Sequence, residues 1–161
     1  MQATSPALQT ELTYTRFDRI SEQHPNRPAV IYLGERFSYR RLRTLSDRFA
    51  GALSAMGIGK GDKVMIYIAN SIQWVIAFLA IQRMGAVLVP ISPIYTSFEI
   101  EYMAKDSGAE TVICQDTNFC YVQEIFPKSG LKRVIVTNLV DLLPPWKRFL
   151  GMLFDKVPGG R

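Results

Sequence analysis

The chain has 161 residues, of which 48% are hydrophobic and 20% are charged, and its net charge is +5 at pH 7. This length and composition suit one domain with a hydrophobic core, and they exclude a wholly disordered chain. The longest apolar run, residues 74–81, is far shorter than the roughly 20 residues that span a bilayer, and no signal-peptide pattern is visible, so a cytoplasmic protein is expected.

The first part of the chain predicts elements that flank a core. Residues 1–12 are polar. A short helix, the two strands of a hairpin and a longer helix follow. Gly34 and Glu35 are the expected hairpin turn, because glycine readily adopts the positive φ angles of tight turns. The predicted ranges are 14–23 for the first helix, 29–33 and 36–39 for the strands, and 40–56 for the second helix.

Five arginines crowd around the start of this second helix and raise the question of nucleic acid binding. Hydrophobic residues in the same stretch recur every three to four positions, which places the arginines mostly on the opposite helix face. No aromatic stacking platform accompanies them. We therefore expect a solvated helix face and no nucleic acid partner. The arginines are Arg36, Arg40, Arg41, Arg43 and Arg48, and the hydrophobic residues are Leu42, Leu45, Phe49 and Leu53.

Three glycines alternate in residues 57–61, a run that could be taken for a phosphate-binding loop. A phosphate loop follows a strand and opens a helix, so that its N–H groups point at the anion. This run follows a predicted helix and precedes a predicted strand. We interpret it as the end of one element and the entry to the next.

The segment from residue 61 to residue 95 predicts a strand–helix–strand unit around which the other elements pack. Residues 63–69 alternate and are rich in Val and Ile, as in a largely buried strand. Residues 86–91 form a second hydrophobic strand. Two strands joined by one helix of this length form a parallel crossover unit.

The helix between these strands is predicted at residues 72–84. Asn70 and Ser71 are suitable capping residues at its start, and a glycine follows its end. Its apolar side chains cover nearly every face, so we expect it to lie inside a core. Trp74 and Phe78 are expected to be core residues.

Strands and helices continue to alternate after this unit. A helix at 97–106, a strand at 111–114, a helix at 117–126 and a strand at 133–137 are predicted. The whole pattern indicates an α/β fold: a mostly parallel, doubly wound sheet flanked by helices, with an amino-terminal β-hairpin.

Cysteine and histidine, which often bind metals or act in catalysis, are sparse in this sequence. Cys114 and Cys120 lie six positions apart without a second pair, and His24 is the only histidine. This pattern argues against zinc and against a disulfide framework, and it suits a reducing cytoplasm. We expect both cysteines to be buried and inert. His24 lies in a proline-rich loop with no partner nucleophile, so we interpret it as a surface residue.

A series of short motifs resembles, in order and spacing, the amino-terminal part of the adenylate-forming (AMP-binding) acyl-CoA synthetases. The resemblance covers roughly residues 12–140 and is specific because it rests on several motifs. It implies that residues 1–140 are a partial AMP-binding α/β domain and that residues 141–161 lead into the remainder of a larger enzyme. The motifs are Arg36-Phe37-Ser38-Tyr39, Asp62-Lys63-Val64, Ile68-Ala69-Asn70-Ser71, Phe78-Leu79-Ala80-Ile81, Gly85-Ala86-Val87, Val89-Pro90-Ile91-Ser92-Pro93-Ile94-Tyr95-Thr96 and Asp106-Ser107-Gly108-Ala109.

Enzymes of this family activate a carboxylate with ATP and Mg²⁺, and then transfer the acyl group from the adenylate to the thiol of coenzyme A. The resemblance therefore implies a fatty or other carboxylic acid, ATP and coenzyme A as partners of the intact enzyme. The family's Ser/Thr/Gly-rich phosphate loop ending in Pro-Lys-Gly, and its carboxy-terminal catalytic lysine, have no counterpart in this sequence. We assign no catalytic, cofactor-binding or metal-binding residue, and expect the chain to be inactive alone.

The tail opens with Pro144 and Pro145, and its apolar residues then follow the spacing of one helix face. One interpretation is an interfacial helix that would place the protein peripherally on a membrane, near bilayer-held substrates. The other is a helix packed on its own domain or on another part of the enzyme. The face comprises Trp146, Phe149, Leu150, Leu153 and Phe154, flanked by Lys147, Arg148 and Lys156.

The favoured function is thus that of an acyl-CoA synthetase segment. The alternatives are a non-catalytic binding or scaffold module of the same fold, and a basic peripheral-membrane protein. The Trp- and Leu-rich tail favours medium-chain or long-chain acids. No pattern in the sequence indicates an oligomeric state.

Overall fold

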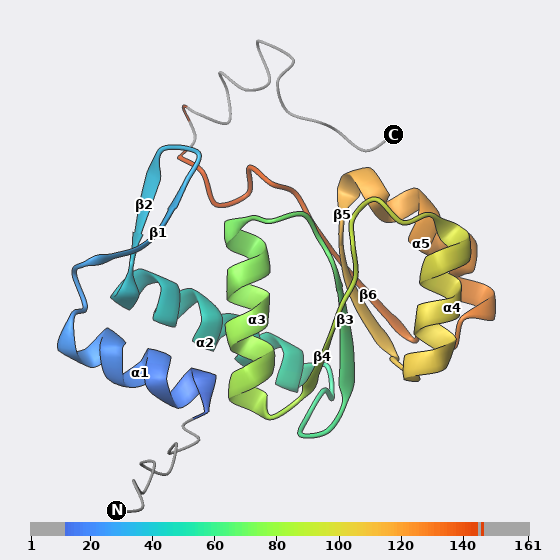
Figure 1. Cartoon of the computed structure of the whole chain (residues 1–161), viewed down its shortest axis with the longest axis horizontal. Helices are drawn as coiled ribbons and strands as arrows, with labels where there is room; N and C mark the ends of the chain where they lie inside the picture. The colour runs from blue at the N-terminus through green and yellow to red at the C-terminus, as the bar shows by residue number, and fades with distance from the viewer. Residues whose placement is uncertain (1–11, 145, 147–161) are drawn as a thin grey trace, which may run out of the picture.

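The computed structural model describes residues 12–144 and Trp146. The parallel strands β3 (Lys63–Tyr67), β4 (Val87–Pro90), β5 (Thr111–Gln115) and β6 (Arg133–Thr137) form a sheet in the order β4-β3-β5-β6. Helices α2 (Tyr39–Ala55) and α3 (Ile72–Met84) cover one face, and α4 (Ser97–Ser107) and α5 (Phe119–Ile125) cover the other (Figure 1). This arrangement confirms the predicted doubly wound α/β fold.

An antiparallel hairpin and a short helix complete the described part of the chain. The helix is α1 (Thr13–Gln23), and the strands are β1 (Pro28–Tyr32) and β2 (Glu35–Ser38). The hairpin turn consists of Leu33 and Gly34, with φ angles of 49° and 75°, and Glu35 already pairs with Tyr32. The predicted turn was therefore wrong by one residue, because a leucine at a positive φ angle is not expected from sequence.

The core has two layers, one on each face of the sheet. The layer under α2 and α3 includes Val64, Ile66, Leu53 and Ile81. The layer under α4 and α5 includes Met65, Tyr67, Val112, Cys114 and Ile100. Because successive residues of a strand point to opposite faces, β3 contributes to both layers. A further cluster beneath the hairpin contains Phe37, Leu42, Ile72, Ile76 and Leu79.

Helix α3 has the predicted bounds and lies in the core as expected. The Ser71 side chain accepts a hydrogen bond from the Trp74 backbone N–H at 3.2 Å, and Gly85 ends the helix with a φ angle of 68°. Ile72, Ala80 and Ile81 are fully buried. Trp74 and Phe78 are only half-buried at the border of the core, where their rings stack with centroids 5.4 Å apart. Their assignment as core residues therefore requires correction.

The glycine run at residues 57–61 connects α2 to β3, as predicted. Gly57 and Gly61 have φ angles of 82° and 86°. The Gly59 backbone N–H donates a hydrogen bond to Asp62 Oδ2 at 2.8 Å, and the Gly61 N–H donates to the Gly85 carbonyl at 2.9 Å. These N–H groups are thus engaged within the protein.

The helix predicted at residues 117–126 is divided into three short pieces. A 3₁₀ turn at Asp116–Asn118 precedes α5, and a second one at Phe126–Lys128 follows it. Pro127 lacks a backbone N–H and cannot continue an α-helical hydrogen-bond pattern.

Within residues 12–144, no helix combines the length and the apolar composition that crossing a membrane requires.

The two cysteines differ in exposure. Cys114 on β5 is fully buried, whereas Cys120 on α5 is exposed. The prediction that both are buried was wrong for Cys120, because α5 directs Val122 and Ile125 into the core. Burial, with a smaller contribution from the Asp116 charge, raises the pKa of the Cys114 thiol to about 12.

We expect a thiol reagent at pH 8 to modify Cys120 rapidly and Cys114 only when the chain unfolds. The thiolate is the reactive form, and Cys114 is both shielded and protonated at this pH. Mass spectrometry of the labelled native protein should find one adduct, and labelling in denaturant should yield two. Cys120→Ser serves as the control and should remove the rapid adduct. Rapid modification of Cys114 in the native protein would contradict the buried position of β5.

Candidate functional site

The carboxyl ends of β3 and β5 form the topological switch point of the sheet. The chain leaves β3 toward α3 on one face and leaves β5 toward α5 on the other (Figure 1). Ligands of open α/β sheets commonly bind in the crevice at such a point. Here the buried Gln115 side chain ties β5 to the segment that follows β3, since its Oε1 accepts a hydrogen bond from the Ala69 backbone N–H at 2.6 Å.

A second polar cluster orders the segment that leaves β6. Gln73 Nε2 donates to the Asn138 carbonyl at 2.8 Å, and Asn138 Nδ2 donates to Asp116 Oδ2 at 2.6 Å. Asp141 Oδ2 accepts from the Asn138 backbone N–H at 2.8 Å. The cluster therefore ties this segment to the start of α3 and to the end of β5. Among the described residues, no group of three or more His, Cys, Asp or Glu side chains could hold a metal ion.

An apolar groove of about 400 Å³ opens beside this cluster, between α2, α3 and β6. We call it the α2–α3–β6 groove. Gln73 lies at its polar end, near Thr137 and Asp141, and Arg48 is the only basic residue among the described residues that line it. The arrangement can accept an apolar group beside a small number of polar atoms. The lining residues are Leu45, Arg48, Phe49, Ala52, Gln73, Ile76, Ala77, Ile113, Ile135, Val136, Thr137, Asp141 and Leu142.

On the other face of the sheet, a tyrosine fixes the loop after β4. The hydroxyl of the buried Tyr67 donates a hydrogen bond to the Tyr95 carbonyl, and Asn118 Nδ2 donates to the Pro93 carbonyl at 3.2 Å. Burial, together with nearby groups that carry negative charge when ionised, raises the pKa of Tyr67 to about 12. The phenol therefore stays protonated at neutral pH and serves as a structural donor.

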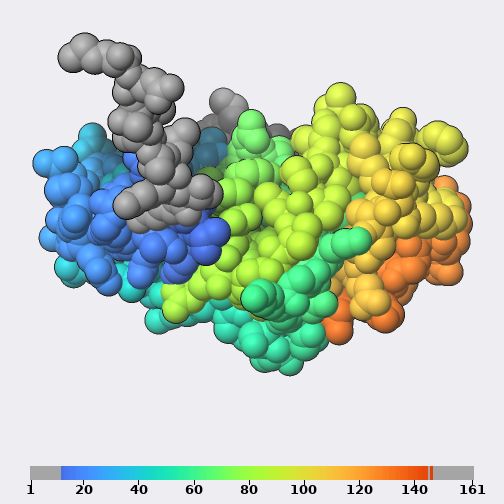
Figure 2. All heavy atoms as spheres, turned by 60° about the horizontal axis from the view of Figure 1, so that its bottom comes forward, coloured from blue at the N-terminus to red at the C-terminus, as the bar shows by residue number. Residues whose placement is uncertain are grey.

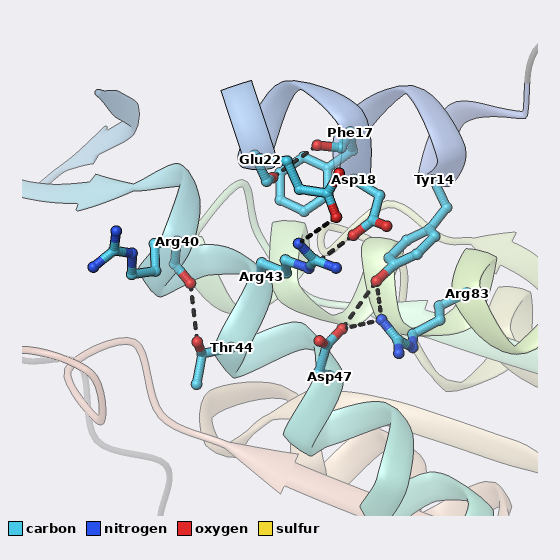
Figure 3. A network of polar contacts seen from close by, with 10 residues as sticks. Tyr14, Phe17, Asp18, Glu22, Arg40, Arg43, Thr44, Asp47 and Arg83 are labelled. Atoms are coloured by element: carbon cyan, nitrogen blue, oxygen red, sulfur yellow. Dashed lines mark hydrogen bonds and ion pairs between the residues drawn. The ribbon is translucent and has the colours of Figure 1, made fainter. Parts of the chain in front are cut away.

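A network of charged side chains joins α1 to α2 and α3 (Figure 3). The Tyr14 hydroxyl donates to Asp47 Oδ1 at 2.9 Å, and Arg83 of α3 contacts both groups. Burial, and then the hydrogen bond to Asp47, raises the pKa of Tyr14. Figure 2 shows the blue α1 lying against the yellow-green α3 on the surface of the molecule. We interpret the network as an anchor for α1.

One of the five crowded arginines, Arg43, takes part in this anchor. Arg43 Nε lies 2.7 Å from Asp18 Oδ1, and Arg43 Nη1 lies 3.3 Å from Glu22 Oε1 (Figure 3). The Arg41 guanidinium lies 4.4 Å from the centroid of the Phe37 ring. The predicted solvated face thus requires correction at Arg43, which contacts α1. The sequence pattern of α2 did not identify this partner, because α1 precedes it by a loop and a hairpin.

The residues proposed from sequence as a membrane or partner face begin at Trp146, the last described residue, and continue beyond it. Trp146 is 59% exposed. Lys147, Arg148, Phe149, Leu150, Leu153 and Phe154 lie outside the described residues. The sequence reasoning overlooked Gln73 and Asn138, which the fold brings together beside the groove. A polar residue in an otherwise apolar helix was the available signal for Gln73.

Comparison with known families and curated proteins covers most of the chain. The model of a family described as AMP-binding enzyme matches residues 17–149. A long-chain-fatty-acid–CoA ligase of Haemophilus influenzae is 33% identical over 135 residues, which are 83% of this chain and 24% of that protein. Surfactin synthase subunit 1 of Bacillus subtilis is 32% identical over 111 residues, 69% of this chain and 3% of that protein.

Solved structures show a similar fold. A crystal structure of a long-chain-fatty-acid–CoA ligase from Archaeoglobus fulgidus has a TM-score of 0.72 and 29% identity, over 77% of this chain and 27% of that one. A coronafacic acid ligase from Pectobacterium brasiliense has a TM-score of 0.75 and 26% identity, over 79% of this chain and 26% of that one. The chain spans about a quarter of the length of the ligases it matches.

Proposed function

Since the chain belongs to the AMP-binding enzyme family, we propose that it forms the amino-terminal part of an ATP-dependent acyl-CoA synthetase. In the proposed reaction, a carboxylate oxygen of the acid attacks the α-phosphorus of ATP, giving an acyl-adenylate and pyrophosphate. The thiol of coenzyme A then attacks the acyl carbon, and AMP leaves. Within such an enzyme the described residues would form the amino-terminal part of a larger domain.

The observation that carries this proposal is the continuous match of one folded unit. Residues 17–149 match the family from α1 to the segment beyond β6. The similarity to the Haemophilus influenzae ligase covers 83% of the chain, so it includes the sheet and its flanking helices. Fold likeness alone would leave the chemistry open, because one fold hosts many functions. The proposal therefore rests on sequence identity together with the fold.

We propose that the described residues alone do not bind ATP. A phosphate group at a helix start needs free backbone N–H groups. At the start of α3, the Trp74 N–H is already bonded to the Ser71 hydroxyl oxygen at 3.2 Å. The glycine run at 57–61 enters a strand, and its Gly59 and Gly61 N–H groups are engaged. We therefore assign ATP, Mg²⁺ and coenzyme A to the intact enzyme and none of them to this segment.

We expect the 161-residue chain alone to release no pyrophosphate in the presence of ATP, Mg²⁺ and a carboxylic acid. No Ser/Thr/Gly-rich loop ending in Pro-Lys-Gly occurs in its sequence, so no group is available to clamp a triphosphate. The assay would use a panel of fatty and aromatic acids, with a full-length ligase as positive control. Acid-dependent release well above a buffer blank, from material free of host synthetases, would contradict this expectation.

We propose a medium-chain or long-chain fatty acid as the substrate of the intact enzyme. The proposal is supported by the names of similar proteins, which include long-chain-fatty-acid–CoA ligases. The DNA after the codon for Arg161 tests the larger assignment directly. An in-frame continuation that encodes the Pro-Lys-Gly loop would support it. A stop codon would contradict it and favour a non-catalytic module of the same fold.

A further inference from the structure

The α2–α3–β6 groove exposes apolar surface on the outer strand of the sheet. Val136 of β6 is 46% exposed, and Ile135 and Leu142 line the groove without being fully buried. Apolar surface that lines a groove can contact another segment or molecule. The molecule or segment that binds there should therefore have apolar groups that match the walls of the groove and a polar group that matches its polar end.

The polar end of the groove has an acceptor without a donor. Gln73 is 8% exposed, and its Oε1 has no hydrogen-bond partner in the described structure. The orientation of the amide is fixed, because its Nε2 donates to the Asn138 carbonyl at 2.8 Å. A buried acceptor left without a donor costs about 1–3 kcal/mol. The occupant should therefore supply an N–H or O–H group at this position, which a hydrocarbon chain cannot do.

We propose that residues 146–157 of this chain, here called the tail segment, form a helix that docks in the α2–α3–β6 groove. Its apolar positions Phe149, Leu150, Leu153 and Phe154 would face the groove. The first turn of a helix has free backbone N–H groups, and one of them would donate to Gln73 Oε1. This inference does not depend on the reaction proposed above.

The position of the tail segment along the chain supports this choice of occupant. Asp141 and Leu142 line the groove, and the tail segment begins four residues after Leu142. The short connection keeps the local concentration of the segment high, on the order of millimolar for a flexible tether. A helix of this length spans about 18 Å at 1.5 Å per residue.

Cross-linking between two introduced cysteines tests the proposal in the 161-residue chain. Ala52 lines the groove but is exposed, so Ala52→Cys should leave the fold intact. It is combined with Leu153→Cys and Cys120→Ser, while the buried Cys114 is retained. A short bismaleimide should link the pair within one chain at least about tenfold faster than it links the matched control. The control replaces Ala52→Cys by Ser54→Cys, because exposed Ser54 does not line the groove.

A second set of variants separates the possible occupants. Leu150→Asp with Phe154→Asp should reduce the linking rate to that of the control, and it should increase hydrogen exchange in β6. Equal rates for the two cysteine pairs would overturn the proposal. Links between two chains would overturn it in favour of a second copy. Co-sedimentation of the chain with anionic vesicles, together with slow linking, would overturn it in favour of a lipid surface.

Discussion

Replacing Ile81 by alanine is expected to lower the free energy of unfolding by about 2–5 kcal/mol. Ile81 is fully buried on α3, where it packs in the layer between this helix and the sheet. The substitution removes buried methyl and methylene groups and leaves a cavity that the surrounding helix and strands fill only partly. Chemical denaturation followed by circular dichroism would measure the change.

Phe78→Ala is the matched comparison on the same helix. Phe78 is half-buried and stacks on Trp74, so its loss should cost only about 1–2 kcal/mol despite the larger side chain. Comparing the two losses in unfolding free energy distinguishes the effect of burial from the effect of side-chain size. A loss below about 1 kcal/mol for Ile81→Ala would show that α3 does not pack against the sheet as described.

The free energy of unfolding is also expected to fall steeply between about pH 9 and pH 12. Burial raises the pKa of Cys114 from 9.0 to about 12 and that of Tyr67 from 10.0 to about 12. Both groups therefore hold their protons more tightly in the folded chain than in the unfolded chain. Their contribution to stability is complete below pH 9 and is lost as the pH rises to 12. Each tenfold change in proton affinity is worth about 1.4 kcal/mol, so a loss on the order of 5 kcal/mol is expected.

Urea denaturation at a series of pH values would measure this loss. Cys114→Ala and Tyr67→Phe each remove one of the two groups, so each should reduce the slope of stability against pH above pH 9. Neither should change the slope below pH 8. Both variants also alter packing, and the comparison therefore uses slopes rather than absolute stabilities. A stability that stays constant up to pH 11 would show that these two side chains are accessible to solvent in the native state.

Helices and strands with strong local sequence signals were predicted most accurately. Helix α3 has the predicted bounds, because Ser71 and Gly85 mark its two ends. The strands of the sheet lie within two residues of their predicted ranges, since continuous Val and Ile runs identify buried strands. The hairpin turn was wrong by one residue because Leu33 adopts a conformation that its residue type disfavours.

The sequence of this protein by itself determined the alternation of strands and helices and the doubly wound α/β class, because capping residues and hydrophobic periodicity are local properties. It also carried the family resemblance, which rests on short motifs in a fixed order. Only the tertiary structure decided which surfaces meet. It placed Arg43 against α1, left Cys120 exposed and brought Gln73 to the polar end of the α2–α3–β6 groove. Periodicity shows which face of an element is apolar, but the partner of that face depends on packing between residues far apart in the chain.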